Sequence, residues 1–218
     1  MTTHRTLRAL AMTLLPGLVL AGLAGCGLIP KKEPLALYSP TAKVAPDPAW
    51  PRVRWQLQIP RPVASELVDS PRIVVRPAPG ELQVYKGAVW AEPTPDLVQA
   101  AVLHAFEDSG RIGGVARRGS GVAGDYELML DVRRFESDYA GGATPRAEVE
   151  ITAKLIANRS NTVVANRTFR QSAMATGTAV GSVAHAFDAA LSAASAEIVG
   201  WTLVEGQRYE AANPRLQL

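Results

Sequence analysis

The sequence predicts an α/β fold in which a largely antiparallel sheet is combined with two main helices. Apolar and polar residues alternate along several segments, most clearly from Ala147 to Ala157, where every odd position is apolar. Two other segments repeat apolar residues at helical spacing, over 94–109 and from Thr178 onward. We therefore expect a single globular domain over 51–204.

Residues 1–25 are typical of a secretory signal peptide, because a short basic region precedes an uncharged stretch over 9–25. That stretch is shorter than the ~20 residues of a spanning helix and contains Pro and Gly midway, so a membrane span is the weaker interpretation. It ends in Leu23-Ala24-Gly25-Cys26, where Cys26 is the only cysteine of the chain. We expect cleavage between Gly25 and Cys26.

The tetrapeptide ending in Cys26 resembles the lipobox of bacterial lipoproteins at all four positions. The resemblance implies that Cys26 is the lipid attachment site, with a diacylglyceryl thioether and an amide-linked acyl chain such as palmitate. Two or more acyl chains hold a protein stably on a membrane, whereas one does so only marginally. The alternative is a buried free thiol. In enterobacterial lipoproteins, Asp directly after the acylated cysteine causes retention in the inner membrane. Here Gly27 occupies that position, so the resemblance implies the outer membrane.

The mature chain is nearly neutral, since removal of residues 1–25 leaves 21 Lys and Arg against 20 Asp and Glu. Its basic residues occur at most in pairs, as at 117–118 and 133–134, so no nucleic-acid partner is expected. Residues 26–50 are rich in proline and predict an extended tether, in which 35–38 could form a first strand.

The first half of the domain predicts a strand at 53–59 and a hairpin from 72–76 and 82–85. Thr94, Pro95 and Asp96 predict a capped helix start, and Ser109-Gly110 its end. The glycine-rich stretch 113–124 is expected to be a mobile loop. It contains no phosphate-binding motif.

The second half predicts three antiparallel strands in succession, at 126–135, 147–157 and 162–171, with a bulge near Arg133-Arg134. A long Ala-rich helix capped by Thr178 follows, and residues 205–218 are expected to be a polar C-terminal tail. One face of this helix is small and weakly polar. It is either buried in the ordinary way or a contact for another protomer, through Ser182, Ala189, Ser192 and Ser195.

No catalytic constellation is recognisable. The sequence has no Gly-x-Ser-x-Gly nucleophile motif. It has three histidines, and none of them stands at a spacing typical of metal ligands. Its carboxylates alternate along strands, as expected of a solvated face. We therefore expect a protein that is not an enzyme and has no metal or other cofactor.

From Leu35 to about Leu203 the order of elements resembles the ABC-type transport auxiliary lipoprotein component family, which is PqiC-like. The matching features are the lipobox, Leu35-Ala-Leu-Tyr38, Ser70–Arg76, Val89-Trp90-Ala91-Glu92 before a capped helix, and Asp125–Glu136 before a two-stranded return and an Ala-rich helix. In Trp90, Ala91 and Glu92 we see a structural signature rather than a ligand site.

The resemblance implies a mixed sheet similar to the amino-terminal domain of TolB. It also implies a lipid-anchored subunit on the periplasmic face of the outer membrane, in a phospholipid transport system with an ABC ATPase, a permease and a mammalian-cell-entry (MCE) protein. Docking of the MCE protein is the expected role, and self-assembly into a homo-oligomer is expected. The alternatives are a periplasmic lipid carrier with its own cavity and an envelope-assembly scaffold.

Overall fold

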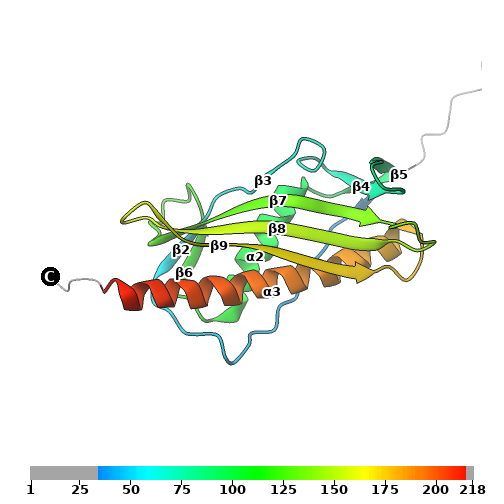
Figure 1. Ribbon diagram of the computed structural model, residues 1–218. Helices are drawn as coiled ribbons and strands as arrows, with labels where there is room; N and C mark the ends of the chain where they lie inside the picture. The colour runs from blue at the N-terminus through cyan, green and yellow to red at the C-terminus, as the bar shows by residue number, and fades with distance from the viewer. Residues whose placement is uncertain (1–33, 215–218) are drawn as a thin grey trace, which may run out of the picture. The chain divides into compact units, whose positions relative to one another are not determined.

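The computed structural model describes residues 34–214, and the residues from Leu35 onward form one compact unit. The fold is mixed α/β, with one sheet and two helices, so the predicted fold class is confirmed (Figure 1). In chain order the elements are β1 Ala36–Tyr38, β2 Gln56–Ile59, β3 Val63–Ala64, β4 Arg72–Arg76, β5 Gln83–Trp90, α2 Thr94–Ser109, β6 Gly114–Arg117, β7 Tyr126–Asp138, β8 Arg146–Ala157, β9 Thr162–Met174 and α3 Val180–Ala212.

Strand β7 organises the sheet. One of its edges pairs antiparallel with β8 along its whole length, and β9 pairs antiparallel with β8, which is the predicted meander. The other edge of β7 accepts β2, β3 and β4 in turn, all parallel. Beyond these, β6 lies beside β2, while β5 and then β1 lie beside β4. The register of β7 against β8 shifts between Val132 and Arg134, as the sequence predicts.

Both helices pack on one face of the sheet, with α3 against β8 and β9 and α2 beside α3 (Figure 1). The odd-numbered residues of β8 are buried in this layer, whereas Lys154 is exposed on the opposite face. Phe135 of β7 stacks on Phe187 of α3 with ring centroids 4.5 Å apart. Trp90, at the end of β5, meets both rings edge-on at 5.8 and 5.1 Å.

Helix α2 has the predicted bounds, but it lacks the predicted cap. Pro93 is the N-cap residue, no side chain caps the helix, and Thr94 is already helical and buried. The backbone N–H of Thr94 instead donates to the Ser70 carbonyl at 3.3 Å. Gly110 ends the helix with φ of 56°, the left-handed conformation that glycine adopts without strain.

The possible first strand predicted at 35–38 is present as β1, whereas residues 41–43 of the predicted tether are bound to α3 rather than free. Strand β1 belongs to the sheet, parallel to β5, and the segment after it lies along α3. There the backbone N–H of Thr41 donates to the Asp188 carboxylate at 2.8 Å, and that of Lys43 donates to the Ser192 hydroxyl at 2.9 Å. Proline-rich backbone is extended, and here polar side chains of a helix satisfy its donors, which composition alone does not reveal.

Two further expectations are corrected. The stretch 113–124 is not wholly a loop, because β6 pairs parallel with β2 over four residues. The C-terminal tail does not begin at residue 205, because α3 continues to Ala212. Its last turns bury the helix face that bears Gly206, and Tyr209 packs edge-on against Tyr126 with centroids 6.2 Å apart. The helix begins at Val180 after Ala179, and Thr178 makes no cap.

By length and composition α3 is the helix, among the described residues, that could cross a membrane, with a mean hydropathy of 1.2 over its most apolar window. Of that window, 56% is buried inside the domain, as expected for a helix packed on a sheet. Two glycines allow this packing. A Cβ atom at Gly200 would lie 2.5 Å from the Trp50 indole nitrogen, and one at Gly206 would lie 2.5 Å from the Trp55 ring.

We predict that Gly206→Ala destabilises the domain although alanine is the better helix former. The added methyl group overlaps Trp55, and overpacking of this kind costs roughly 1–3 kcal/mol. Gly181→Ala is the control in the same helix, since its Cβ would meet Tyr38 at an ordinary 3.9 Å. Chemical denaturation of both variants measures the difference in the free energy of unfolding. Equal stability of the two variants would show that Trp55 does not hold α3.

Candidate interaction site

The residues predicted for lipid attachment and cleavage, Cys26 and Gly25, lie outside the described residues, so both assignments stay predictions. The signature Trp90, Ala91 and Glu92 falls at the junction of β5 and α2. Trp90 is buried in the core, and the backbone N–H of Ala91 donates to the Tyr38 carbonyl at 2.7 Å. Ala91 and Glu92 line a surface hollow of about 250 Å³ between α2 and the segment that follows β1.

The four residues of the face predicted for self-assembly differ in their exposure. Ser195 is completely buried, and its hydroxyl has no hydrogen-bond partner among the described residues. Ser192 is covered, because its hydroxyl accepts from Lys43 and donates to the Asp188 carbonyl at 2.6 Å. Ala189 is exposed and Ser182 half-buried. The inclusion of Ser195 in a contact surface is therefore wrong, and self-assembly through the remaining positions stays a prediction.

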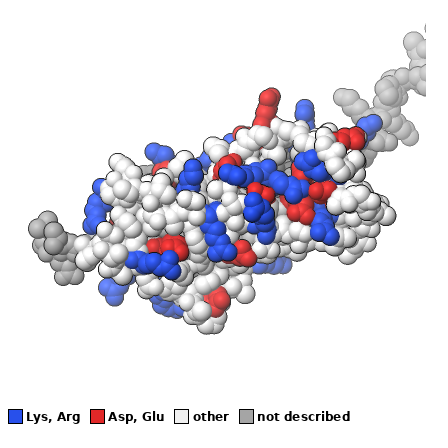
Figure 2. Space-filling view, viewed as in Figure 1, with Lys and Arg blue, Asp and Glu red and all other residues white. Residues whose placement is uncertain are grey.

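The open face of the sheet carries an ion network (Figure 2). The Glu136 carboxylate accepts from Arg76 Nε at 2.9 Å and from Arg134 Nη2 at 2.7 Å, although its side chain is only 5% exposed. Arg134 also binds Asp138 at 2.8 Å. The hydrogen bond to Glu136 raises the pKa of Arg76 above its usual value. Cations and anions are paired here, so this face presents a surface of mixed sign.

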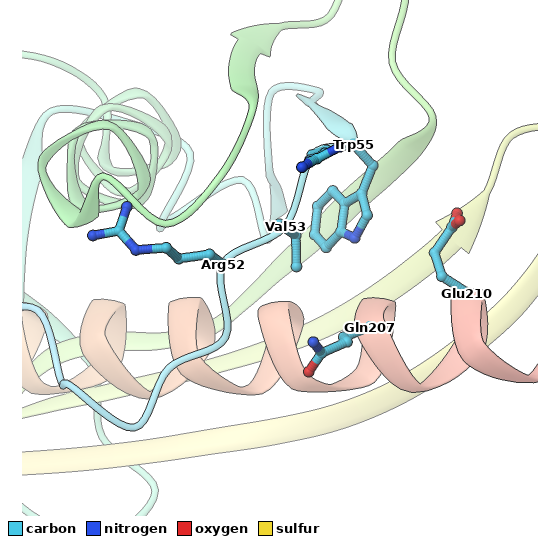
Figure 3. Close-up of a pocket in the computed structure, with 6 residues that line it drawn as sticks. Arg52, Val53, Trp55, Gln207 and Glu210 are labelled. Carbon is cyan, nitrogen blue, oxygen red and sulfur yellow. The ribbon is translucent and has the colours of Figure 1, made fainter.

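A hollow of about 350 Å³ lies at the C-terminal end of α3 (Figure 3). The segment before β2 forms one wall and α3 forms the other. Trp55 packs against Gly206 of α3, and its indole N–H has no hydrogen-bond partner among the described residues. Two exposed cations, Arg52 and Arg54, stand on the first wall. The lining residues are Arg52, Val53, Arg54, Trp55, Gln207 and Glu210.

A second hollow, of about 270 Å³, adjoins the first and shares Glu210 with it. Tyr126 separates the two. Its ring packs on Trp55 with centroids 4.8 Å apart, and its hydroxyl donates to the Glu210 carboxylate at 2.8 Å. Hydrogen bonds with Ser160 and Thr162 lower the pKa of Tyr209. Trp, Tyr and Arg are the residues that dominate protein–protein hot spots, so this pair of hollows is the candidate interaction site.

The carboxylates near these surfaces are engaged in contacts within the domain. Residues 34–214 contain no group of three or more His, Cys, Asp or Glu side chains that could hold a metal ion. The carboxylates of the open face are bound by arginines, and Glu210 accepts from Tyr126. The described residues thus form a mixed-sheet α/β domain with open hollows at one end.

The comparisons identify the family. The ABC-type transport auxiliary lipoprotein component model matches residues 35–199, and the chain belongs to this family. The crystal structure of protein XCC0632 from Xanthomonas campestris shares 50% identity, with a TM-score of 0.78, over 81% of this chain and 99% of that one. A solved structure of an uncharacterized protein shares the fold at 14% identity and a TM-score of 0.61, over 77% of this chain and 97% of that one.

A curated relative is an uncharacterized protein of Bradyrhizobium diazoefficiens, 29% identical over 157 residues, which are 72% of this chain and 42% of the relative. The chain thus spans less than half the length of that relative. The family is an auxiliary component of ABC-type transport and a lipoprotein family, which gives a cell-envelope setting and an association with an ABC transporter. The resemblance to TolB stays a prediction.

Sequence reasoning missed the candidate interaction site. Its two walls, near residues 52–55 and 207–210, lie at opposite ends of the domain's sequence, and the second wall falls in the segment predicted to be a tail. One signal was available. A glycine in an otherwise regular helix costs about 1 kcal/mol relative to alanine, so Gly206 indicates a close approach by another part of the chain.

We predict opposite outcomes for the same substitution at two positions of α3. Ser195→Arg places an unpaired charge in the core and should cost several kcal/mol, whereas Ala189→Arg remains solvated and should change stability by less than about 0.5 kcal/mol. Thermal unfolding of the monomeric domain measures both. If Ser195→Arg melts with the wild type, the packing of α3 described above is wrong.

Proposed function

We propose that the protein is a non-enzymatic, lipid-anchored subunit that docks the MCE protein of an ABC-type phospholipid transport system to the periplasmic face of the outer membrane. The family match over residues 35–199 carries this proposal, because it ties the domain to ABC transport. The lipobox at Leu23-Ala24-Gly25-Cys26 stands a few residues before the matched region and supplies the means of anchoring.

The candidate interaction site is where the MCE protein docks in this proposal. It combines aromatic rings, which bury a large area at low entropic cost, with two exposed arginines, Arg52 and Arg54. Arg54 is exposed and is therefore suited to an acidic or carbonyl-rich segment of the partner. ATP hydrolysis and passage through the membrane belong to the ATPase and the permease.

A lipid carrier with its own cavity is less well supported. The space between the helices and the sheet is occupied by large side chains, including Trp90, Phe135 and Phe187. The hollows described above lie open on the surface and have volumes of about 250 to 350 Å³. An acyl chain of a phospholipid would need the core to open, whereas a docked protein segment would not.

Co-flotation with liposomes tests the proposal. The acylated full chain should carry the periplasmic part of its MCE partner to the top of a density gradient, and Cys26→Ser should leave both proteins at the bottom. Arg54→Glu should float normally but carry at least about tenfold less partner, as expected when a charge at an interface is reversed. The control is Lys154→Glu, the same charge change on the open face of the sheet.

Each result separates one part of the proposal from the others. Flotation of Cys26→Ser would contradict anchoring through acylation. Equal partner binding by Arg54→Glu and Lys154→Glu would place the docking surface elsewhere on the domain. Floating wild-type protein that carries no MCE partner at all would contradict the docking role, and stoichiometric phospholipid in the purified unacylated chain would favour the carrier.

A further inference from the structure

The two ends of the sheet differ in charge. One end of the sheet is where β4, β7 and β9 end and β5 and β8 begin. We call this end, together with loops 77–82, 139–145 and 175–179, the proximal end. In these three loops Glu81 is the only charged residue. In Figure 2 this end lies on the right, where white atoms extend beyond the ion network of the open face.

The opposite, distal end is rich in charge and contains the candidate interaction site. There the loops before β2 and β6, the loop between β8 and β9 and the last turns of α3 come together. Each of these segments carries ionised side chains. The ionised residues at the distal end are Asp47, Arg52, Arg54, Arg111, Asp125, Arg159, Glu205, Arg208 and Glu210.

The proximal end also exposes large apolar side chains. Met174, the last residue of β9, is 57% exposed, and Leu82, just before β5, is 45% exposed. The register places them in one row across the sheet, because Met174 lies opposite Arg146, Arg146 opposite Asp138, and Asp138 opposite Arg76. Leu82 precedes Gln83, which lies opposite Val75, the neighbour of Arg76. The charged residues of this row, Arg146, Asp138 and Arg76, lie within the strands, whereas the loops beyond them carry only Glu81. Exposed apolar residues beside loops so poor in charge mark a contact surface.

Strand β1 runs away from this end, so its first residue is the one nearest to it. Strand β1 runs parallel to β5 with Ala36 opposite Ala88, so the backbone before β1 points toward the start of β5. Eight residues lie between Cys26 and Leu35, and the nine steps along the backbone span at most about 30 Å when fully extended. The long strands measure about 40 Å from end to end, since β9 has 13 residues. A lipid on Cys26 therefore brings the bilayer within reach of the proximal end first.

We propose that the proximal end rests on the lipid bilayer, with Leu82 and Met174 inserted at the interface and the three loops, in which Glu81 is the only charged residue, at the level of the headgroups. This inference depends on the proposed acylation of Cys26 and is independent of which protein binds the distal end. Apolar side chains gain from leaving water, and few ionised groups lose hydration at this end. The arrangement would hold the distal end about 40 Å from the bilayer, away from the lipid.

Single cysteines test the orientation, because Cys26 is the only cysteine and is acylated in the proposed mature chain. Met174→Cys and Leu82→Cys receive an environment-sensitive fluorophore at the proximal end. Val163→Cys and Val122→Cys are controls on the distal half with matching exposure, 56% for Val163 against 57% for Met174 and 46% for Val122 against 45% for Leu82. The acylated full chain is placed in phosphatidylethanolamine and phosphatidylglycerol vesicles that contain a nitroxide lipid. Mass spectrometry first confirms acylation.

The expected result is a blue shift and at least about twofold stronger quenching at positions 82 and 174 than at 163 and 122, as for side chains in the interface. Equal quenching at all four positions, or stronger quenching at 163 and 122, overturns the proposal while leaving the anchor intact. A blue shift at positions 82 and 174 that persists in detergent, without quenching by the nitroxide lipid, would assign this end to a contact with a second copy of the chain. That result would also overturn the proposal. A chain that is not acylated contradicts the anchor itself.

Discussion

The stacked contact between Phe135 and Phe187, closed on its side by Trp90, joins the three parts of the fold. Phe135 belongs to the central strand β7, Phe187 to α3, and Trp90 to the end of β5, just before α2. All three rings are at most 1% exposed. Because Tyr38 of β1 lies opposite Trp90 in the sheet, the first strand is held by the same cluster. Loss of this contact would remove the aromatic packing that links the meander, the hairpin and the C-terminal helix.

Helix α3, which bears Phe187, makes further contacts near both ends of the domain. Near its start Gly181 lies against Tyr38, and near its end Gly206 receives Trp55 while Glu210 accepts from Tyr126. Its 33 residues correspond to roughly 50 Å, enough to run the full length of the sheet. The helix therefore fixes the candidate interaction site at one end relative to the charge-poor loops at the other. The proposed docking role needs such a rigid separation.

The parts of the fold that sequence could predict are those governed by local periodicity. Alternation from Ala147 to Ala157 gives both the strand and its buried face, and the phase slip near Arg133-Arg134 gives the bulge. Pro95 and Gly110 give the bounds of α2. The parts that failed depend on partners distant in sequence. Short parallel strands such as β1 and β6 have too few residues for a periodic signal.

The same limit applies to the candidate interaction site and to α3. Ser195 looks like a surface residue by type, yet α3 is enclosed by the sheet, α2 and the segment after β1, so a small hydroxyl is buried. Arg52 and Gln207 face one hollow only because Trp55 fits against Gly206. No pattern within either segment predicts the other. The predicted lipobox, in contrast, is a local signal that needs no tertiary structure.

Photo-cross-linking in the intact cell envelope tests the central claim, that a lipid-anchored domain presents its distal end to the MCE protein. A photoreactive amino acid replaces Arg54, which is exposed on the wall of the candidate interaction site. The account predicts an adduct that contains the MCE protein and requires Cys26. An adduct with phospholipid would instead place this end on the membrane, and an adduct with a second copy of the chain would make it a self-assembly surface. Either result would contradict the account.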